Sequence, residues 1–199
     1  ATFAGNNSYK ATTVSYTVTV YEPVVFTAFF ESFDNCATGK EGGNDGKWSG
    51  VSTSGQITYE NTGWAATNMN PADRCLRGGT SNKQGSITTP ALKLDPADTY
   101  VLTFKAGAWK DASTTMTLTS TDGVFAGETS TTVTMADQNW TGYYVELTAG
   151  AATTTVTFSS TERFFIDEVR VMEKSAYEAL APSKTVESYG WATYIPDYN

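Results

Sequence analysis

Residues 163–172 read RFFIDEVRVM, and this stretch indicates both the kind of fold and a place where a polar group enters it. Aromatic and β-branched residues in a run of this length are typical of a buried strand. With strict alternation along the run, Phe165, Asp167 and Val169 share one face. A carboxylate among apolar neighbours must be protonated, paired or bound to a metal, because a lone buried charge is very unfavourable.

Similar short runs recur along the chain, and we expect strands at 12–20, 24–33, 56–60, 88–94, 99–107, 114–120, 130–135, 142–148, 153–160 and 163–172. Residues 34–55 and 61–87 are polar and glycine-rich, which is typical of long loops. Many strands at spacings of about 8–12 residues predict an all-β sandwich or barrel rather than a parallel α/β fold. One helix signal occurs, because residues 175–178 (SAYE) resemble a capping box ahead of Pro182.

The composition agrees with an all-β fold and excludes several classes of function. Threonine accounts for 34 of 199 residues, which favours strands. Histidine is absent, which excludes Ser-His-Asp catalysis and histidine-bound zinc. With 13 basic and 21 acidic residues the formal charge is -8, so we expect no attraction to nucleic acid or to an anionic membrane. No apolar run is long enough for a transmembrane segment, and no membrane insertion is expected.

The two cysteines, Cys36 and Cys75, lie 39 positions apart. An even pair in an acidic, threonine-rich chain predicts a disulfide in an oxidising compartment. The alternative is a pair of unrelated buried thiols. The chain begins at Ala1 without a methionine, so we expect an excised or processed piece of a longer protein.

Two acidic residues occupy positions where apolar side chains are expected. Glu31 shares a strand face with Phe29 and Phe33, and Asp167 lies in the last strand. Oxygen ligands of this kind suit calcium, so we predict a Ca²⁺ ion held by Glu31 and Asp167, with Asp34 as a further ligand.

Two alternatives stay open for these carboxylates. Asp167 could pair with Arg163 or Arg170, and Glu31 could point outward at an edge, because alternation alone does not fix which face is core. The glycine-rich stretch 42–46 (GGNDG) offers Asn44 or Asp45 as a weaker ligand, but such a stretch is more often a plain turn.

Aromatic residues in predicted loops suggest carbohydrate binding. Rings stack on the C–H faces of sugars, and loops on a β scaffold often carry binding residues. Trp48, Trp64 and Trp109 are therefore candidate sugar-binding residues, together with Arg74 next to Cys75. The alternative for each tryptophan is ordinary packing, and Trp140 is expected in the core.

Catalysis by paired carboxylates is the weakest hypothesis. Glycosidases use two acids across a cleft, but no spacing singles out a pair among Asp34, Glu60, Asp111 and Glu128. We therefore expect the chain not to be an enzyme.

Several motifs together resemble a known family. These are FFESFDNC (29–36), GGNDGKWSG (42–50), CLRGGTSNKQGSITTPAL (75–92), YVLTFKAGAW (100–109) and RFFIDEVRV (163–171). They are similar to the jelly-roll, galactose-binding-like domains of the cleaved-adhesin and choice-of-anchor type in surface proteins of Gram-negative anaerobes. The resemblance covers about residues 24–173. It implies a sandwich of two antiparallel sheets, extracellular glycan binding, and a structural calcium ion held by Glu31 and Asp167.

The resemblance also predicts how the chain is organised. Residues 1–22 look like the end of an Ig-like repeat, 23–173 form the sandwich, and 174–199 form a short helix and a tail leading to another domain. We expect a non-catalytic carbohydrate-binding-type module of a secreted or surface protein, with extracellular glycan, surface protein and adjacent domains as partners. The alternative is a structural or adhesive spacer.

Overall fold

The structure is a computed structural model that describes residues 2–3, 12–13, 27–36, 55–109 and 112–180. The expected strand at 12–20 and the GGNDG stretch therefore lie largely or wholly outside the described residues. Two short strands near the start, β1 (Thr2–Phe3) and β2 (Thr12–Thr13), pair with each other. All the other strands belong to two antiparallel sheets, as the sequence predicted.

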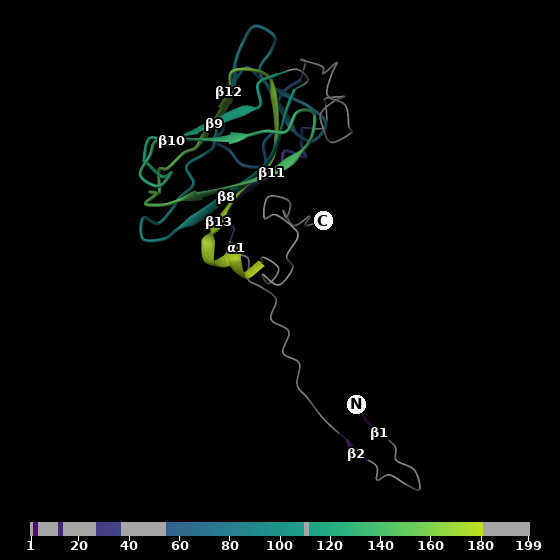
Figure 1. Ribbon diagram of the computed structural model, residues 1–199, viewed down its shortest axis with the longest axis vertical. Coiled ribbons are helices and arrows are strands. Elements are labelled where there is room, and N and C mark those ends of the chain that lie inside the picture. The colour runs from purple at the N-terminus through teal and green to yellow at the C-terminus, as the bar shows by residue number, and fades with distance from the viewer. Residues whose placement is uncertain (1, 4–11, 14–26, 37–54, 110–111, 181–199) are drawn as a thin grey trace.

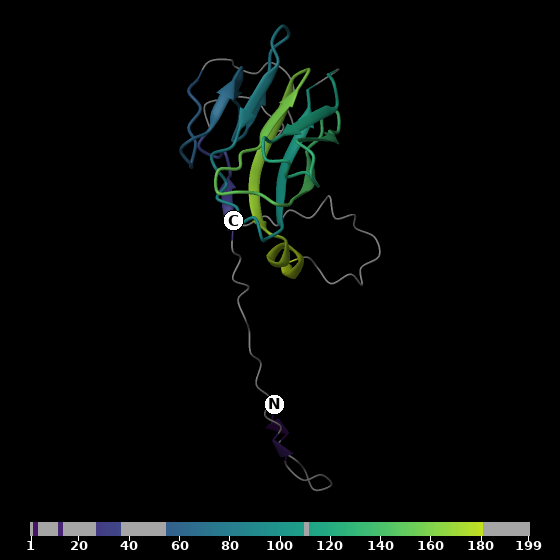
Figure 2. The same cartoon turned by 90° about the vertical axis from the view of Figure 1, so that its left-hand side faces the viewer.

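The two sheets face one another as layers of a β-sandwich (Figures 1 and 2). One sheet has five strands, in the order β10 (Ser130–Thr134), β9 (Thr115–Thr119), β12 (Thr157–Ser160), β7 (Gly85–Thr88) and β4 (Ala65–Thr67). The other has six, in the order β11 (Thr141–Leu147), β8 (Tyr100–Ala108), β13 (Phe164–Glu173), β6 (Leu76–Gly78) and β5 (Met69–Pro71), with β3 (Thr27–Glu31) also on β13.

Strand β13 organises the six-stranded sheet because it has three partners. Along one edge it pairs with β8, and on the other its first residues pair with β6 and its last residues with β3. A bulge interrupts the pairing with β8, where Glu168 and Val169 oppose the single Phe104. Glu168 has a positive φ of 48° at this point. Such a bulge reverses the side-chain alternation of the residues that follow.

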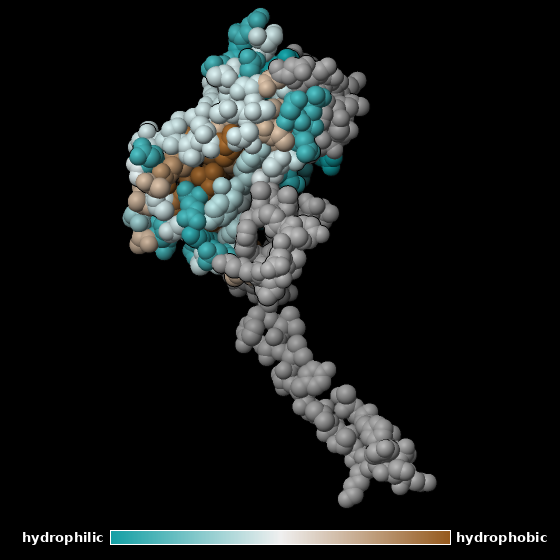
Figure 3. Space-filling view, in the orientation of Figure 1, coloured by the Kyte–Doolittle hydropathy of each residue, from teal (hydrophilic) through white to brown (hydrophobic). Residues whose placement is uncertain are grey.

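The core between the sheets is aromatic and aliphatic. Phe104 of β8 meets Phe158 of β12 edge to face at 5.0 Å, which joins the two layers. The inward residues after the bulge are Val169 and Val171, while Ile166 faces inward before it. On the open side, between β10 and β11, partly buried Val133, Tyr143 and Val145 pack against the core, and apolar surface is visible between the layers in Figure 3.

The short helix α1 (Lys174–Leu180) follows β13 and contacts β13 and β8. Ser175 is the second residue of the helix rather than the residue ahead of it, so the predicted capping position is too late in the sequence. Lys174 forms an ion pair with Glu146 of β11 at 2.7 Å, and Tyr177 packs against Tyr144. In the part of the chain that the structure describes, this seven-residue helix is too short to span a membrane.

Candidate functional site

Glu31, at the end of β3, is fully buried, and N–H groups surround its carboxylate. Oε1 accepts a hydrogen bond from the backbone N–H of Glu60 at 2.8 Å. Oε2 accepts from the backbone N–H of Asn61 at 3.0 Å, from Asn61 Nδ2 at 3.1 Å and from Trp64 Nε1 at 2.9 Å. Bonds to an ionised acceptor are stronger than neutral ones, so Glu31 fixes the 60–64 segment against the sandwich.

Trp64 belongs to this same buried arrangement. Its ring stacks on Tyr59 at 5.8 Å and packs against Phe29 and Phe33 at 5.6 and 5.3 Å. The ring is partly buried, and its N–H donates a hydrogen bond to Glu31. The structure therefore places this predicted sugar-binding residue in a packing role.

Asp167, the other predicted calcium ligand, faces the other way. Phe165 lies on the outer face of the six-stranded sheet and Ile166 in the core, so alternation places Asp167 on the outer face. The bulge at Glu168 then returns Val169 to the core, which strict alternation did not anticipate. Glu31 binds a core-facing tryptophan, so the two acids do not converge on one face.

The surroundings of Glu31 do not fit a calcium ligand, because hydrogen-bond donors already occupy both oxygens. Asp34 is exposed. Within the described ranges, no group of three or more His, Cys, Asp or Glu residues is arranged to hold a metal ion. The sequence-based expectation of calcium held by Glu31, Asp167 and Asp34 is therefore not supported by the surroundings of Glu31, and chelation tests it directly.

With the Glu31 oxygens engaged by N–H groups, we expect the melting temperature in excess EDTA to equal that in excess calcium. Differential scanning calorimetry of the same preparation in both buffers makes the measurement. A melting temperature several degrees lower in EDTA would show a bound ion. An Asp167→Asn variant that lost this sensitivity would place the ion at the predicted residue.

The structure corrects the predicted disulfide. Cys36 and Cys75 are both buried thiols, and no S–S bond joins them. Cys36 lies in the core between the sheets, whereas Cys75 packs with Trp109 and Phe165 on the outer face of the six-stranded sheet. The sheet therefore separates the two sulfur atoms. Sequence spacing gave no information on this, because it does not show on which side of a sheet each cysteine lies.

We expect two thiols to react with Ellman's reagent in denaturant without reductant, and neither to react quickly in the folded chain. Burial raises the pKa of Cys36 to about 11, with smaller contributions from the nearby negative charges of Glu31, Asp167 and Glu60. The thiolate is the reactive form, so the folded-state rate should rise as the pH approaches 11. Detection of fewer than two thiols in denaturant would instead support the predicted disulfide.

A second cluster covers the outer face of the six-stranded sheet, and we call it the outer-face cluster. It consists of Ala72, Cys75, Trp109 and Phe165, with Ala112 and Trp140 packed against them. Trp109 stacks on Phe165 at 5.5 Å and an interplanar angle of 14°. The Arg163 guanidinium lies 4.4 Å from the centre of the Trp109 ring, and that of Arg77 lies 5.6 Å from it. Trp140 meets Phe165 at 6.2 Å and is partly exposed.

Of the other predicted binding residues, Arg74 lies beside this cluster in the turn between Ala72 and Cys75. Its side chain is 56% exposed and pairs with Asp73 at 3.5 Å. Trp48 lies outside the described residues. Trp109 belongs to the outer-face cluster but is only 7% exposed, so it packs beneath the surface residues and offers little area to a ligand. Sequence reasoning missed Trp140, whose position directly before a strand suggested the core.

The acids considered for catalysis do not form a recognisable pair among the described residues. Glu60 accepts hydrogen bonds from the backbone N–H and the hydroxyl of Ser32, and the same hydroxyl accepts from the backbone N–H of Asp34. Glu128 and Asp34 are exposed, and Asp111 lies outside the described residues.

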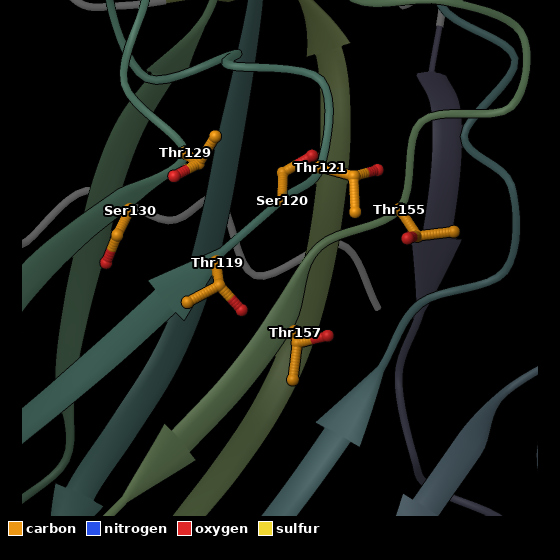
Figure 4. A pocket seen from close by; sticks show the side chains of 7 residues that line it. All are labelled: Thr119, Ser120, Thr121, Thr129, Ser130, Thr155 and Thr157. Atoms are coloured by element: carbon orange, nitrogen blue, oxygen red, sulfur yellow. The ribbon is translucent and has the colours of Figure 1, made fainter.

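The five-stranded sheet carries a hollow of about 490 Å³ at one end, lined by Thr119, Ser120, Thr121, Thr129, Ser130, Thr155 and Thr157 (Figure 4). All of these side chains are hydroxyls, without a ring or a charge. Ligand sites usually combine apolar surface with a few directed polar groups. This hollow is therefore a poorer candidate than the outer-face cluster.

No family model and no curated protein matches the sequence. The structure is similar to solved structures of cleaved-adhesin and carbohydrate-binding domains. The K3 cleaved adhesin domain of Lys-gingipain from Porphyromonas gingivalis is 19% identical, with a TM-score of 0.42 over 73% of this chain and 99% of that one. The CBM22-1 xylan-binding domain of Paenibacillus barcinonensis Xyn10C is 10% identical, with a TM-score of 0.46 over 77% and 97%. This partial likeness assigns no ligand and no residue role to the present chain.

Proposed function

We propose that the chain is a non-catalytic carbohydrate-binding module, and that its ligand lies on the outer face of the six-stranded sheet. One observation carries the proposal: Trp109, Trp140 and Phe165 gather on that face with two guanidinium groups directly over the Trp109 ring. Sugar binding needs apolar rings beside groups that hydrogen-bond hydroxyls. The acidic charge and threonine-rich composition support a place outside the cell, in a secreted or surface protein with neighbouring domains.

The accessible members of the cluster define how a sugar would be held. Trp140 and Arg163 are both partly exposed, so they can contact a ligand directly. Trp109 and Phe165 are buried and stack on each other, and they contact the exposed residues, since Arg163 lies over the Trp109 ring and Trp140 packs at an angle against Phe165. Lys105 of β8 and Glu168 of β13, ion-paired at 2.7 Å, add polar groups on two interior strands of the same sheet. The proposed role is binding alone.

The test is a glycan array followed by titration calorimetry, with calcium present. We expect saturable binding to one class of glycan, weakened about tenfold or more by Trp140→Ala, which corresponds to about 1.4 kcal/mol. Thr132→Ala, an exposed residue of β10 on the other sheet, is the matched control and should bind as wild type. Equal loss in both variants, or full binding in Trp140→Ala, would contradict the proposed site.

A structural or adhesive spacer is the second candidate, and one observation favours it. In the described part of the chain every tryptophan and tyrosine is buried or half-buried, so no ring is fully open to solvent. A spacer would give no signal across neutral and anionic glycans while keeping a cooperative thermal transition.

A further inference from the structure

The arginines of this chain are concentrated in one region. The sequence contains four, Arg74, Arg77, Arg163 and Arg170, in a chain whose formal charge is -8. Arg77 belongs to β6 and Arg170 to β13, and each of the other two lies within two residues of one of these neighbouring strands. The threonine-rich five-stranded sheet has none among its described strands.

Contacts place these guanidinium groups on the outer face. Arg163 and Arg77 both lie over Trp109, and Arg170 lies 4.3 Å from the ring centre of Phe30. Leu76 faces the core, so alternation turns its neighbour Arg77 outward. The turn that carries Arg74 has Ala72 and Cys75 in the outer-face cluster.

Two of these positive charges are held close together. Arg163 and Arg77 share one indole ring, at 4.4 and 5.6 Å from its centre. Burial lowers the pKa of Arg77, and the positive charge of Arg163 lowers it further. Like charges that packing fixes in proximity create a positive potential, which an anion placed above them would relieve.

Exposure separates the roles of the four arginines. Arg77 and Arg170 are 4% and 8% exposed, so they contribute to the potential from within the surface. Arg163 is partly exposed and Arg74 largely exposed, so these two can reach a ligand. A guanidinium held over an indole ring is pre-organised, and the fork of N–H groups that it presents suits the paired oxygens of a carboxylate or a sulfate.

Acids lie on this face as well as cations. Among the described residues, Asp73 is ion-paired with Arg74, Glu168 with Lys105 and Glu146 with Lys174, and Asp167 is a further acid. The two guanidinium groups that share the Trp109 ring therefore form a local concentration of positive charge on a chain that is negative as a whole.

We infer that the glycan bound at the outer-face cluster is anionic. Arg163 would donate hydrogen bonds to a uronic-acid carboxylate or a sulfate ester, while its guanidinium packs on Trp109. This inference rests on the proposed function and names its class of ligand. Trp140 would contact the adjoining sugar ring.

Matched polysaccharide pairs test the charge directly. The full chain is titrated with polygalacturonate and its fully methyl-esterified form, and with dextran sulfate and dextran. We expect binding to at least one anionic member and at least about tenfold weaker binding to its neutral counterpart. Affinity should fall severalfold between about 0.05 M and about 0.5 M NaCl, because salt screens charge pairs. Polygalacturonate and dextran sulfate distinguish a carboxylate from a sulfate as the preferred group.

Variants place the effect at Arg163. Arg163→Gln should lose about tenfold or more in affinity for the anionic probe, and Arg163→Lys should recover only part of it, because lysine keeps the charge but lacks the planar fork. Lys93→Gln removes an exposed cation beside the 151–154 turn and should bind as wild type. Salt-independent binding to the neutral members would overturn the inference and leave the proposed function standing, whereas silence with every probe would overturn both.

Discussion

Replacing Glu31 with alanine is expected to lower the free energy of unfolding by about 3–5 kcal/mol, which is an exceptional effect for one residue. The variant removes the carboxylate that accepts four hydrogen bonds, from Glu60, Asn61 and Trp64, at a partly buried place, and of these donor groups Asn61 Nδ2 keeps a second acceptor in the carbonyl of Phe30. Each of the other donors loses its water on folding and gains nothing in return. Urea unfolding followed by tryptophan fluorescence and by circular dichroism measures the change.

Two further variants make this result specific. Glu31→Gln keeps the shape but directs an NH₂ group at other donors, so it should recover little of the loss. Glu128→Ala removes an exposed glutamate from a turn and should stay within about 0.5 kcal/mol of wild type. If Glu31→Ala were as stable as Glu128→Ala, the hydrogen-bonded carboxylate would not be what fixes the 60–64 segment.

Gly85→Ala is the second substitution with a large expected effect, of about 3 kcal/mol or more. A Cβ at Gly85 would lie 2.2 Å from the nitrogen of Gly79 and 2.6 Å from the carbonyl carbon of Gly78. Both atoms are backbone, so no side chain can rotate away. At this place β6 of one sheet ends and β7 of the other begins, and the backbones of the two strands are in direct contact.

Gly127→Ala is the comparison for this substitution. Its new methyl group would meet nothing within 4 Å, although the φ of 91° imposes backbone strain. We expect a loss of about 1 kcal/mol there. Urea midpoints and soluble yield at a lowered growth temperature are compared for the two variants. Equal stability of both variants would contradict the close approach of the sheets at Gly85.

Strands with a clear two-residue period were predictable. The runs at 99–107, 114–120, 130–135, 142–148 and 163–172 match β8, β9, β10, β11 and β13 within two residues at either end. Each carries enough alternating or buried apolar residues to specify a strand locally. The sandwich class followed from their number and spacing.

Short and irregular strands were not predictable. Strands β4, β5 and β6 are three residues each and lie in the polar stretch that looked like a loop. Conversely, residues 89–94 are not a regular strand: Pro90 has no N–H, and Lys93 has a positive φ of 55°. This segment instead hydrogen-bonds to 151–156 at Thr89, Leu92 and Leu94.

The candidate site was less predictable than the fold, for a physical reason. Glu31 and Asp167 were correctly expected to be buried, but the bulge at Glu168 returns Val169 to the core, so Asp167 shares the outer face with Phe165 and not with Val169. Trp64 was expected to bind sugar but is partly buried against the core, while Trp140 was expected in the core but packs against the outer-face cluster. A register shift of one residue exchanges the two faces of a sheet, and sequence alone does not report it.

The most direct test of the binding face is a ¹⁵N NMR titration that follows the tryptophan indole N–H signals, assigned by Trp→Phe substitution. The labelled chain is titrated in turn with neutral xylo-oligosaccharides and with oligogalacturonates. The account predicts that the Trp109 and Trp140 signals shift with saturation, while the Trp64 signal, held by Glu31, stays in place. Shifts confined to Trp64, or to backbone signals of the five-stranded sheet, would contradict the proposed face.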